Sequence, residues 1–454
     1  MGTCESLVRK EVLPRKQITT TSGIVEGSRH ETADGFLSDV FLGIPYAKPP
    51  IGELRFKVKT AFEALKWTKE NIHSFGGDPN QITIGGQSAG GVSTDLLSIS
   101  PLSRDMFHRK IVMGGSSFNS WAVSSKEEIT DYCRQKAIKV GWKPRKEDPA
   151  SYILMHIYKQ LTSGYSSQLE ENESMVEYLR TVPAAKFGTH MIGCRVVFEE
   201  CRLPLAPVID GEILPKEIPL MRAEAPPKES IVGVGQEESL LFIALDAIKC
   251  DGKDMNKLIG ALSKKTKKVG QKDITEAIRK LYGYTDMVSY NKKAMRKIFA
   301  TCLSDVISNY ACYRYMQHSQ SHMKDTYAYS FDYTSKNMWG WLIPMIPYMA
   351  GTHSSDIIYL FDCNYFTAPL PMNKTDRRIS QMTSSYFAQF VKKGNPNSEH
   401  TSNFEWKPIK KDSDVQMFSI CKEPKMLDEV FGNRITQLDS IMAEIQYVVG
   451  DNRR

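Results

Sequence analysis

The chain contains 454 residues, of which 41% are hydrophobic and 24% are charged, the balance of an ordinary globular protein with ample core. Its 59 basic and 52 acidic residues leave a net charge of only +7, spread along the chain, so the sequence indicates no nucleic-acid partner. The densest basic run, residues 264–268, is interpreted as a solvated helix end or loop rather than as a binding surface.

Cysteine and histidine residues are both dispersed. The nine cysteines include no Cys-x-x-Cys pair and the nine histidines form no cluster, so the sequence predicts neither a disulfide framework nor a metal site. The first 16 residues lack the apolar core of a signal peptide, and no later run is long enough to span a bilayer. We therefore expect a cytoplasmic protein that is not secreted.

Residues 1–16 are expected to form a flexible N-terminal segment that carries one positive signal. Its first six residues, MGTCES, fit the acceptor pattern for myristoylation at Gly2, and Cys4 offers a thiol for palmitate. Two acyl chains hold a protein stably at a membrane, whereas one holds it only marginally. The segment is a candidate lipid anchor for the inner leaflet of a membrane; the alternative is an unmodified, disordered start.

Strand and helix patterns alternate along the rest of the chain. Residues 18–40, rich in Thr, Gly and Ser, predict a hairpin, and residues 60–75 predict an amphipathic helix that Gly76-Gly77 ends. The further predicted strands are 81–84, 110–114, 231–235 and 326–333, the last with one aromatic face. The further predicted helical regions are 240–323, 382–392 and the tail. Strands separated by helices indicate an α/β architecture with a mainly parallel sheet.

The pentad at 86–90, Gly-Gln-Ser-Ala-Gly, follows the strand predicted at 81–84 and precedes a helical pattern. In so sharp a turn, Gly86 and Gly90 are expected to remove Cβ atoms that would collide. Ser88 at the apex is expected to take a strained backbone with an exposed hydroxyl. A Gly-x-Ser-x-Gly pentad is common by chance, and its position between a strand and a helix is what makes Ser88 a candidate nucleophile.

A serine nucleophile needs a base, and the base needs a carboxylate that orients it. In a strand-to-helix arrangement of this kind, the expected order along the chain is serine, acid, histidine. Glu237 and Glu238 directly follow the strand predicted at 231–235, and His353 lies in the loop region after the strand predicted at 326–333. Either glutamate fits the position of the acid, so these residues alone leave that choice open.

Seven short stretches carry a family pattern: FLGIPYA (41–47), FGGDP (75–79), GQSAG (86–90), VIDG (208–211), QEES (236–239), GTH (351–353) and GNPN (394–397). Together they resemble the type B carboxylesterases, the cholinesterase-like branch of the α/β-hydrolases, across residues 17–447. The resemblance implies Ser88 as nucleophile, His353 as base and then acid, and Glu238 as the orienting carboxylate, because the family's acid directly precedes a small residue, here Ser239. It implies ester hydrolysis through an acyl-enzyme, without cofactor or metal.

Three departures from the family pattern affect the site. Gln87 stands where many members have glutamate, and Gly114-Gly115-Ser116 replaces a Ser-Gly-Ser that supplies a polar partner. Near residues 57–60 the chain lacks a long internal block, which in the family carries the His-Gly-Gly-Gly oxyanion loop, the choline-binding aromatic residue and two central strands. The backbone N–H of Ala89 remains as one oxyanion donor.

The missing block predicts consequences for the sheet and for activity. The strand before Ser88 would become an exposed apolar edge, and we expect either a rearranged, poorly stable sheet or a chain that represents a variant transcript or a faulty gene model. Each lost oxyanion donor lowers turnover by roughly a hundred- to a thousandfold.

We therefore expect a hydrolase for small, uncharged esters with an apolar part. Choline esters are disfavoured because the family's cation-binding aromatic residue is missing. Trp339 and Trp341 are candidates for lining the substrate gorge, unless they simply pack a loop. The alternative function is that of a non-catalytic or impaired esterase-like protein that binds small esters.

Overall fold

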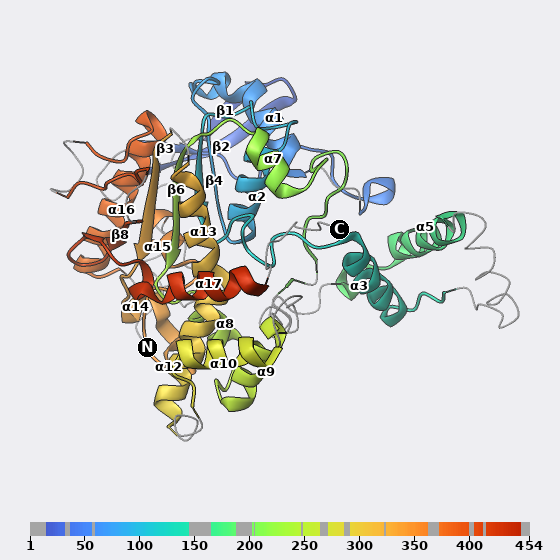
Figure 1. Cartoon of the computed structure of the whole chain (residues 1–454). Coiled ribbons are helices and arrows are strands. Elements are labelled where there is room, and N and C mark those ends of the chain that lie inside the picture. Colours follow the sequence, from blue (N-terminus) through green and yellow to red (C-terminus); the bar gives the residue numbers. More distant parts are fainter. Residues whose placement is uncertain are drawn as a thin grey trace, which may run out of the picture. The chain divides into compact units, whose positions relative to one another are not determined.

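The computed structural model describes residues 15–31, 37–56, 60–144, 165–187, 202–203, 205–246, 248–263, 271–285, 291–321, 324–361, 372–398, 404–411 and 415–445 (Figure 1). Contacts within the chain divide it into two compact units, Met1–Ile82 and Thr83–Arg454. Gly2 and Cys4 lie outside the described residues, so their acylation stays a prediction.

The first unit contains a three-stranded antiparallel sheet. Its strand β2 (Gly23–Glu31) pairs on one side with β1 (Lys16–Thr20) and on the other with β3 (Leu37–Val40). The predicted hairpin is therefore confirmed, and a third strand extends it. No described strand of this sheet is paired with the larger sheet of the second unit.

The helix predicted at 60–75 is confirmed, with a tighter last turn. It forms as α1 (Thr60–Asn71) followed by the 3-10 turn η3 (Ile72–Phe75). Gly76 ends it with a φ of 81°, a left-handed conformation that glycine adopts without a steric penalty. The buried side chain of Asn71 accepts a hydrogen bond of 2.7 Å from the Thr21 backbone N–H, which ties the helix to the β1–β2 turn. The short turn η2 (Gly52–Leu54) precedes this helix.

The second unit contains a six-stranded sheet in the order β4-β5-β6-β7-β8-β9. The strands are β4 (Thr83–Gln87), β5 (Arg109–Met113), β6 (Glu229–Gly235), β7 (Thr326–Phe331), β8 (Met417–Ile420) and β9 (Lys425–Leu427). The first five run parallel to their neighbours, and β9 pairs antiparallel with β8. The predicted α/β architecture with a mainly parallel sheet is thus confirmed.

The strand β4 stands at the edge of this sheet, as predicted, with β5 as its one described partner strand. Two details of the prediction are wrong. The strand runs to Gln87 rather than ending at 84, because its backbone pairs with β5 through Gly85 and Gly86 despite their low β-propensity. It is also partly buried over most of its length instead of being an exposed apolar edge.

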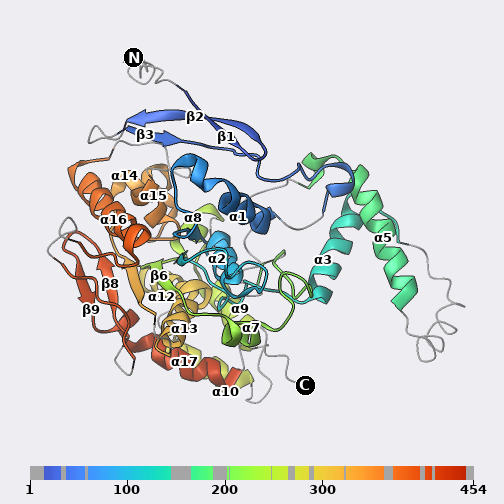
Figure 2. The same ribbon diagram turned by 90° about the horizontal axis from the view of Figure 1, so that it is seen from above.

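Helices flank the large sheet, and Figure 2 shows α16 and α13 on opposite sides of β6. The helices and helical turns of the second unit are α2 (Ala89–Ile99), α3 (Lys126–Lys139), α5 (Tyr165–Thr181), η4 (Ala184–Lys186), α7 (Ile218–Glu224), α8 (Leu240–Leu245), α9 (Gly252–Ser263), α10 (Gln271–Leu281), α12 (Lys292–Ser304), η5 (Asp305–Asn309), α13 (Tyr310–Ser319), α14 (Lys336–Trp339), η6 (Gly340–Met345), α15 (Ser355–Phe361), α16 (Lys374–Lys393), η7 (Val430–Asn433) and α17 (Arg434–Ile445). The helical regions predicted at 240–323 and in the tail are confirmed. Among the described helices, none combines the length and the apolar character that crossing a membrane requires.

The aromatic face predicted for the fourth strand forms the centre of the core. All six residues of β7 are buried, and Tyr329 packs edge-on against Phe387 of α16 with ring centroids 5.6 Å apart. Trp406 is fully buried beside it, stacks on Phe418 at 5.1 Å, and donates its indole N–H to Ala328 at 3.0 Å. This dense packing fixes the middle of the sheet.

Two features of the last third of the chain differ from the prediction. The helix α16 begins at Lys374 rather than at 382, because Asn373 and Asp376 form a capping box at its start. The short strands β8 and β9 were not predicted, although β8 is fully buried beside β7. Both strands are too short for their apolar pattern to stand out from a loop.

Candidate active site

Ser88 stands at a sharp strand-to-helix turn between β4 and α2. Its φ of 60° and ψ of −124° are unusual for a residue with a side chain, so the predicted strain is confirmed. The Ser88 N–H donates to Met113 O at 2.8 Å, and Ser88 O accepts from the Val92 N–H at 3.0 Å. The two bonds hold the apex between the neighbouring strand and the first turn of the helix.

Glycine is required at two positions around this turn, and one of them differs from the prediction. A Cβ on Gly86 would lie 2.3 Å from the Gly90 backbone, as expected for a collision across the turn. A Cβ on Gly90 would meet no atom within 4 Å, so the role predicted for Gly90 is wrong. The tight position is instead Gly91, where a Cβ would lie 2.4 Å from Gly115 O, because α2 passes close to the loop after β5.

Glu238 and His353 form a buried pair in the second unit. The Nδ1–H of His353 donates to Glu238 Oε2, and the imidazole packs against Phe242 with ring centroids 4.9 Å apart. Glu238 also accepts from the Gly235 backbone N–H at 2.5 Å and from the Ser308 hydroxyl at 3.3 Å. Donors on several sides therefore fix the carboxylate, and the carboxylate in turn fixes the ring orientation and the tautomer of the histidine.

Glu237, the other candidate acid, has different partners. Its carboxylate accepts hydrogen bonds from Thr301 at 3.0 Å and from Ser304 at 3.1 Å, both on α12. Burial raises the pKa of the Glu237 carboxyl above its usual value. Of the two glutamates that the sequence leaves open, the structure pairs Glu238 with the histidine.

Backbone contacts bind the loop that carries His353 to the loop after β6. The Glu237 N–H donates to Gly351 O at 2.8 Å, and the Thr352 hydroxyl accepts from the Leu241 N–H at 3.0 Å. Gly351 must be glycine, because a Cβ there would lie 2.0 Å from Phe331 O at the end of β7. The positions of Glu238 and His353 are therefore set by the central strands.

Gln87 makes the contact that the nucleophile would be expected to make. Its Nε2 lies 3.2 Å from His353 Nε2, and no hydrogen bond joins Ser88 to His353 in the described structure. Since Nδ1 of His353 carries the proton given to Glu238, Nε2 is the acceptor and the Gln87 amide is the donor. The structure brings Glu238 and His353 together, and the nitrogen that a serine nucleophile would need contacts Gln87, the residue before Ser88.

The second departure from the family pattern lies at the same place. Gly114 has a φ of 59°, and a Cβ there would lie 3.0 Å from Gln87 Nε2 and 3.4 Å from the His353 ring. Glycine therefore leaves the room in which the Gln87–His353 contact forms. The departures at 87 and 114, which look independent in the sequence, are one structural feature.

The remaining candidates occupy simpler positions. Ala89 is the first residue of α2, so its N–H has no carbonyl one turn earlier in the helix and remains a candidate oxyanion donor. Trp339 is almost fully buried and donates to Thr334 at 3.1 Å, so it packs the loop, whereas Trp341 is 53% exposed. No group of metal-ligand side chains gathers within the described ranges.

Asp356 is a site neighbour that the sequence did not single out. Its carboxylate is buried, accepts the Tyr329 hydroxyl at 2.5 Å, and accepts the Ile357 N–H at 2.9 Å. Burial raises the pKa of Asp356 to about 6, and the nearby Glu238 charge acts in the same direction. The stretch Gly-Thr-His-Ser-Ser-Asp contains the signal, since the acid follows the histidine within one helical turn.

The strained turn at Ser88 and the Glu238–His353 pair stand at the ends of strands of an α/β sheet, and a comparison with known proteins identifies the family of this chain. The chain matches the model of the carboxylesterase family over residues 14–61 and 58–437, and it belongs to that family. The two matched segments meet at residues 58–61, close to the predicted internal deletion at 57–60, which itself stays a prediction.

Three curated relatives illustrate the relationship. The chain is 29% identical over 350 residues to esterase cest-33 of Caenorhabditis elegans, which covers 76% of this chain and 57% of that protein. It is 26% identical over 362 residues to bile salt-activated lipase of Bos taurus, and the match covers 77% of this chain and 55% of that protein. It is 27% identical over 388 residues to gut esterase 1 of Caenorhabditis elegans, and the match covers 79% of this chain and 61% of that protein. The chain thus spans little more than half the length of the curated relatives it matches.

Proposed function

We propose that the chain hydrolyses small, uncharged carboxylic esters with an apolar part, using Ser88, His353 and Glu238. The observation that carries this proposal is the buried Glu238–His353 pair, whose carboxylate also accepts bonds from Gly235 and Ser308. A histidine so oriented is suited to take a proton at Nε2. The strained, glycine-flanked turn at Ser88 supports the role of the serine as nucleophile.

In the proposed reaction, Ser88 Oγ attacks the ester carbonyl carbon while His353 Nε2 accepts the hydroxyl proton. The tetrahedral intermediate collapses, the C–O bond to the alcohol breaks, and His353 gives its proton to the departing alkoxide. Water then attacks the acyl-enzyme with His353 again as base, which releases the carboxylic acid and restores Ser88. Glu238 stabilises the imidazolium in both halves.

Two features of the site are expected to make this reaction slow. The oxyanion that develops has the Ala89 N–H as a donor, but the glycine loop that supplies the family's other donors is not in the sequence. The Gln87 amide must also leave His353 Nε2 before Ser88 can use it. We therefore expect measurable but weak turnover, with no cofactor required.

The test is hydrolysis of a small chromogenic ester by the purified chain and by its Ser88→Ala variant. We expect the variant to lose at least about a hundredfold in kcat/KM. Ser93→Ala is the matched control, because Ser93 lies one turn into the same helix and its hydroxyl only bonds Ala89 O at 2.9 Å. Equal rates for the chain and Ser88→Ala would overturn the proposal.

The second candidate function is an impaired or non-catalytic esterase-like protein that binds small esters. The contact between Gln87 and the base nitrogen favours it, as does the missing oxyanion block. A fluorophosphonate probe separates the cases, because it labels an activated serine without requiring turnover. Labelling of Ser88 without ester hydrolysis would indicate an impaired enzyme, and absence of labelling would indicate a binding protein.

We further propose that the N-terminus associates with a membrane surface through a myristoyl group on Gly2 and a palmitoyl group on Cys4. The support is the acceptor pattern of the first six residues. Mass spectrometry of the N-terminal peptide from eukaryotic cells tests it. An unmodified Gly2 would contradict the proposal, and a Gly2→Ala variant is expected to move from the membrane to the soluble fraction.

A further inference from the structure

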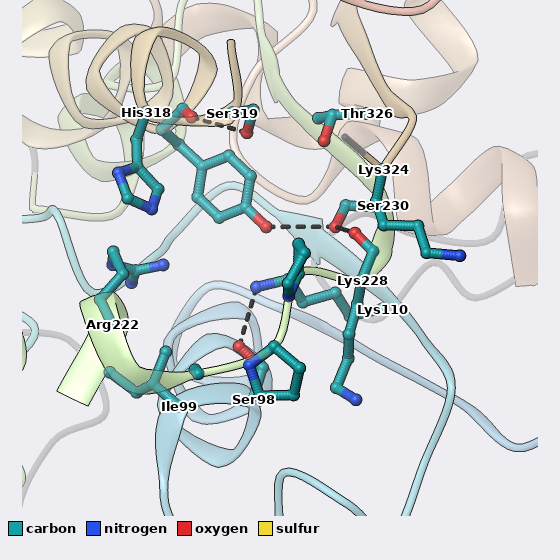
Figure 3. Close-up of a pocket in the computed structure, with 14 residues that line it drawn as sticks. Ser98, Ile99, Lys110, Arg222, Lys228, Ser230, His318, Ser319, Lys324 and Thr326 are labelled. Atoms are coloured by element: carbon teal, nitrogen blue, oxygen red, sulfur yellow. Dashed lines mark hydrogen bonds between the residues drawn. The ribbon is translucent and has the colours of Figure 1, made fainter. Parts of the chain in front are cut away.

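A small pocket lies at the strand ends opposite to those near Ser88. Lys110, Ser230 and Thr326 stand in the first two positions of β5, β6 and β7 and line it, whereas Ser88 follows the last residue of β4 (Figure 3). Its volume is about 40 Å³, counted as the space open to the centre of a water-sized sphere. One water needs roughly 10–15 Å³ by that measure, so the pocket has room for a small ion.

Two buried cations share one carboxylate beside this pocket. Asp95 accepts from Lys110 Nζ at 3.1 Å and from Arg222 at 2.6 Å, and all three side chains are more than nine-tenths buried. The two cations hold the pKa of the Asp95 carboxyl far below its usual range, so it carries one negative charge against two positive ones. Among the residues that the structure describes, Asp95 is the ion-pair partner of both cations, so one positive charge is left without a counter-ion in a region of low dielectric.

The guanidinium of Arg222 also has a donor that nothing accepts. Two of its nitrogens bond Asp95, but its Nε is buried and has no hydrogen-bond partner. A buried donor without a partner is unusual in a folded protein. The ring centroid of Phe118 lies 4.6 Å from the guanidinium carbon of Arg222. The phenyl ring has no oxygen or nitrogen atom that could accept the Nε–H.

The two other lysines that line the pocket have partners elsewhere. Figure 3 shows Lys228 and Lys324 extending away from Arg222, whereas Lys110 Nζ bonds Asp95 and also donates to Ser98 at 2.8 Å. Lys228 Nζ donates to Phe107 O at 2.9 Å, and Lys324 pairs with Glu229 at 3.5 Å. They raise the positive potential at the pocket without neutralising the buried charge.

We propose that this pocket binds a small oxyanion, a phosphate, a sulfate or a carboxylate group, through Arg222 and Lys110. Such a ligand would supply the missing negative charge, and its oxygens would accept from the unpartnered Arg222 Nε. Guanidinium groups bind the oxygens of phosphate, sulfate and carboxylate groups with paired hydrogen bonds. Lys110, which bonds the same carboxylate as Arg222, would supply a second positive charge.

The test is titration of the full chain with sodium phosphate, sodium sulfate and sodium acetate by isothermal calorimetry, at constant ionic strength set with chloride. We expect saturable binding of at least one anion, with chloride inert at the same ionic strength. Tighter binding of phosphate or sulfate would identify a tetrahedral ligand, and tighter binding of acetate would identify a carboxylate. Absence of saturable heat for all three would overturn the proposal.

Two variants assign the binding to the pocket. Arg222→Lys keeps the charge but loses the paired donors, and we expect it to weaken binding by about tenfold or more. Lys293→Gln removes an exposed lysine on α12 and is expected to leave the affinity within about twofold. Equal weakening by the two variants would show screening of the net charge rather than a site.

A third variant covers the case in which Arg222→Lys fails to fold. Ala225→Leu fills the pocket from its lining while keeping every charge, and Ala225 has an extended backbone that accepts a larger side chain. We expect it to abolish binding, and retained affinity would overturn the proposal. The site is independent of ester hydrolysis, so Ser88→Ala should bind the anion with unchanged affinity whichever way the activity assay turns out.

Discussion

The two halves of the candidate active site rest on different parts of the same sheet. Glu238 and His353 depend on β6 and β7, which have neighbours on both sides, and every residue of β7 is buried. Ser88 follows β4, which has one described neighbour and is only partly buried. The acid–base pair is thus positioned by dense packing, whereas the nucleophile is positioned by local backbone geometry at an edge strand.

Gln87 is the residue through which the two halves touch. It belongs to the edge strand, yet its amide reaches the histidine of the packed half, and the glycine at 114 leaves the space for it. The acid–base pair is thus fully assembled while its Nε2 contacts a residue of the edge strand other than the serine. Under the proposed function, this contact and the missing oxyanion donors together limit the rate.

The largest expected effect is on the packed half. Glu238→Gln removes the carboxylate that holds the His353 tautomer and is expected to lower kcat by about a thousand- to ten-thousandfold. Glu237→Gln is the matched control, since its partners lie on α12, and it should change kcat by less than about tenfold. Steady-state kinetics on the same ester measure both. Equal losses would break the distinction between the two glutamates.

The stability of the two halves should differ as their packing does. Trp406→Ala opens the aromatic core around β7 and is expected to reduce the free energy of unfolding by about 3–5 kcal/mol. Ile84→Ala on the partly buried edge strand should reduce it by about 1–2 kcal/mol. Urea unfolding compares the two free energies of unfolding. Far-ultraviolet circular dichroism follows the transition, because Trp406→Ala removes a fluorescent residue. A larger loss at Ile84 would mean that β4 is not the weaker strand.

A pH-dependent effect is expected at Asp356. Its folded pKa of about 6 lies above the ordinary 3.8, so the folded state holds this proton more tightly than the unfolded state does. The stabilisation by this group is complete below about pH 4 and is lost as the pH rises through about 6, by up to about 3 kcal/mol. Asp356→Asn mimics the protonated form and should be the more stable protein at neutral pH.

Urea unfolding of the chain and Asp356→Asn across this pH range measures the difference. The two free energies of unfolding should converge toward acidic pH and separate as the pH rises. Parallel curves would show that the folded structure does not raise this pKa. The amide of asparagine can still bond the Tyr329 hydroxyl, so the variant keeps the local contact.

The smallest expected effect is at the junction of the halves. Gln87→Glu replaces a donor by a carboxylate, which favours the protonated His353 and should raise the pH midpoint of kcat/KM by about one unit. Gln87→Ala removes the contact without adding a negative charge, so we do not expect it to raise the pH midpoint of kcat/KM in the same way. The pH profile of ester hydrolysis measures both variants. Identical midpoints for the chain and Gln87→Glu would contradict the contact.

Local sequence signals predicted the backbone of the candidate site. The glycines around Ser88 and the order of Ser88, Glu238 and His353 indicate a strand-end site, because Ser88 and Glu238 closely follow strands that their own composition reveals and His353 lies in the loop region after a third. The capping box at Asn373 and Asp376 is an equally local signal, and it marks the true start of α16.

Contacts between distant residues could not be predicted in this way. Gln87 and His353 are 266 residues apart, and Asp95 and Arg222 are 127 residues apart, so no periodicity or spacing links them. The space at Gly114 depends on how three segments meet, which only the tertiary fold determines. The same holds for the extent of β4, where pairing with β5 carries the strand through two glycines against their propensity.

The division of the chain between Ile82 and Thr83 has a consequence for how such a protein can change over generations. Ser88, Glu238, His353 and the cationic pocket all belong to the later unit, whereas residues 57–60 belong to the earlier one. Exon exchange or recombination before residue 83 therefore edits a part of the gene that encodes none of these groups. Restoring the oxyanion loop expected near residues 57–60 would therefore change the first unit alone and leave the codons of Ser88, Glu238 and His353 as they are.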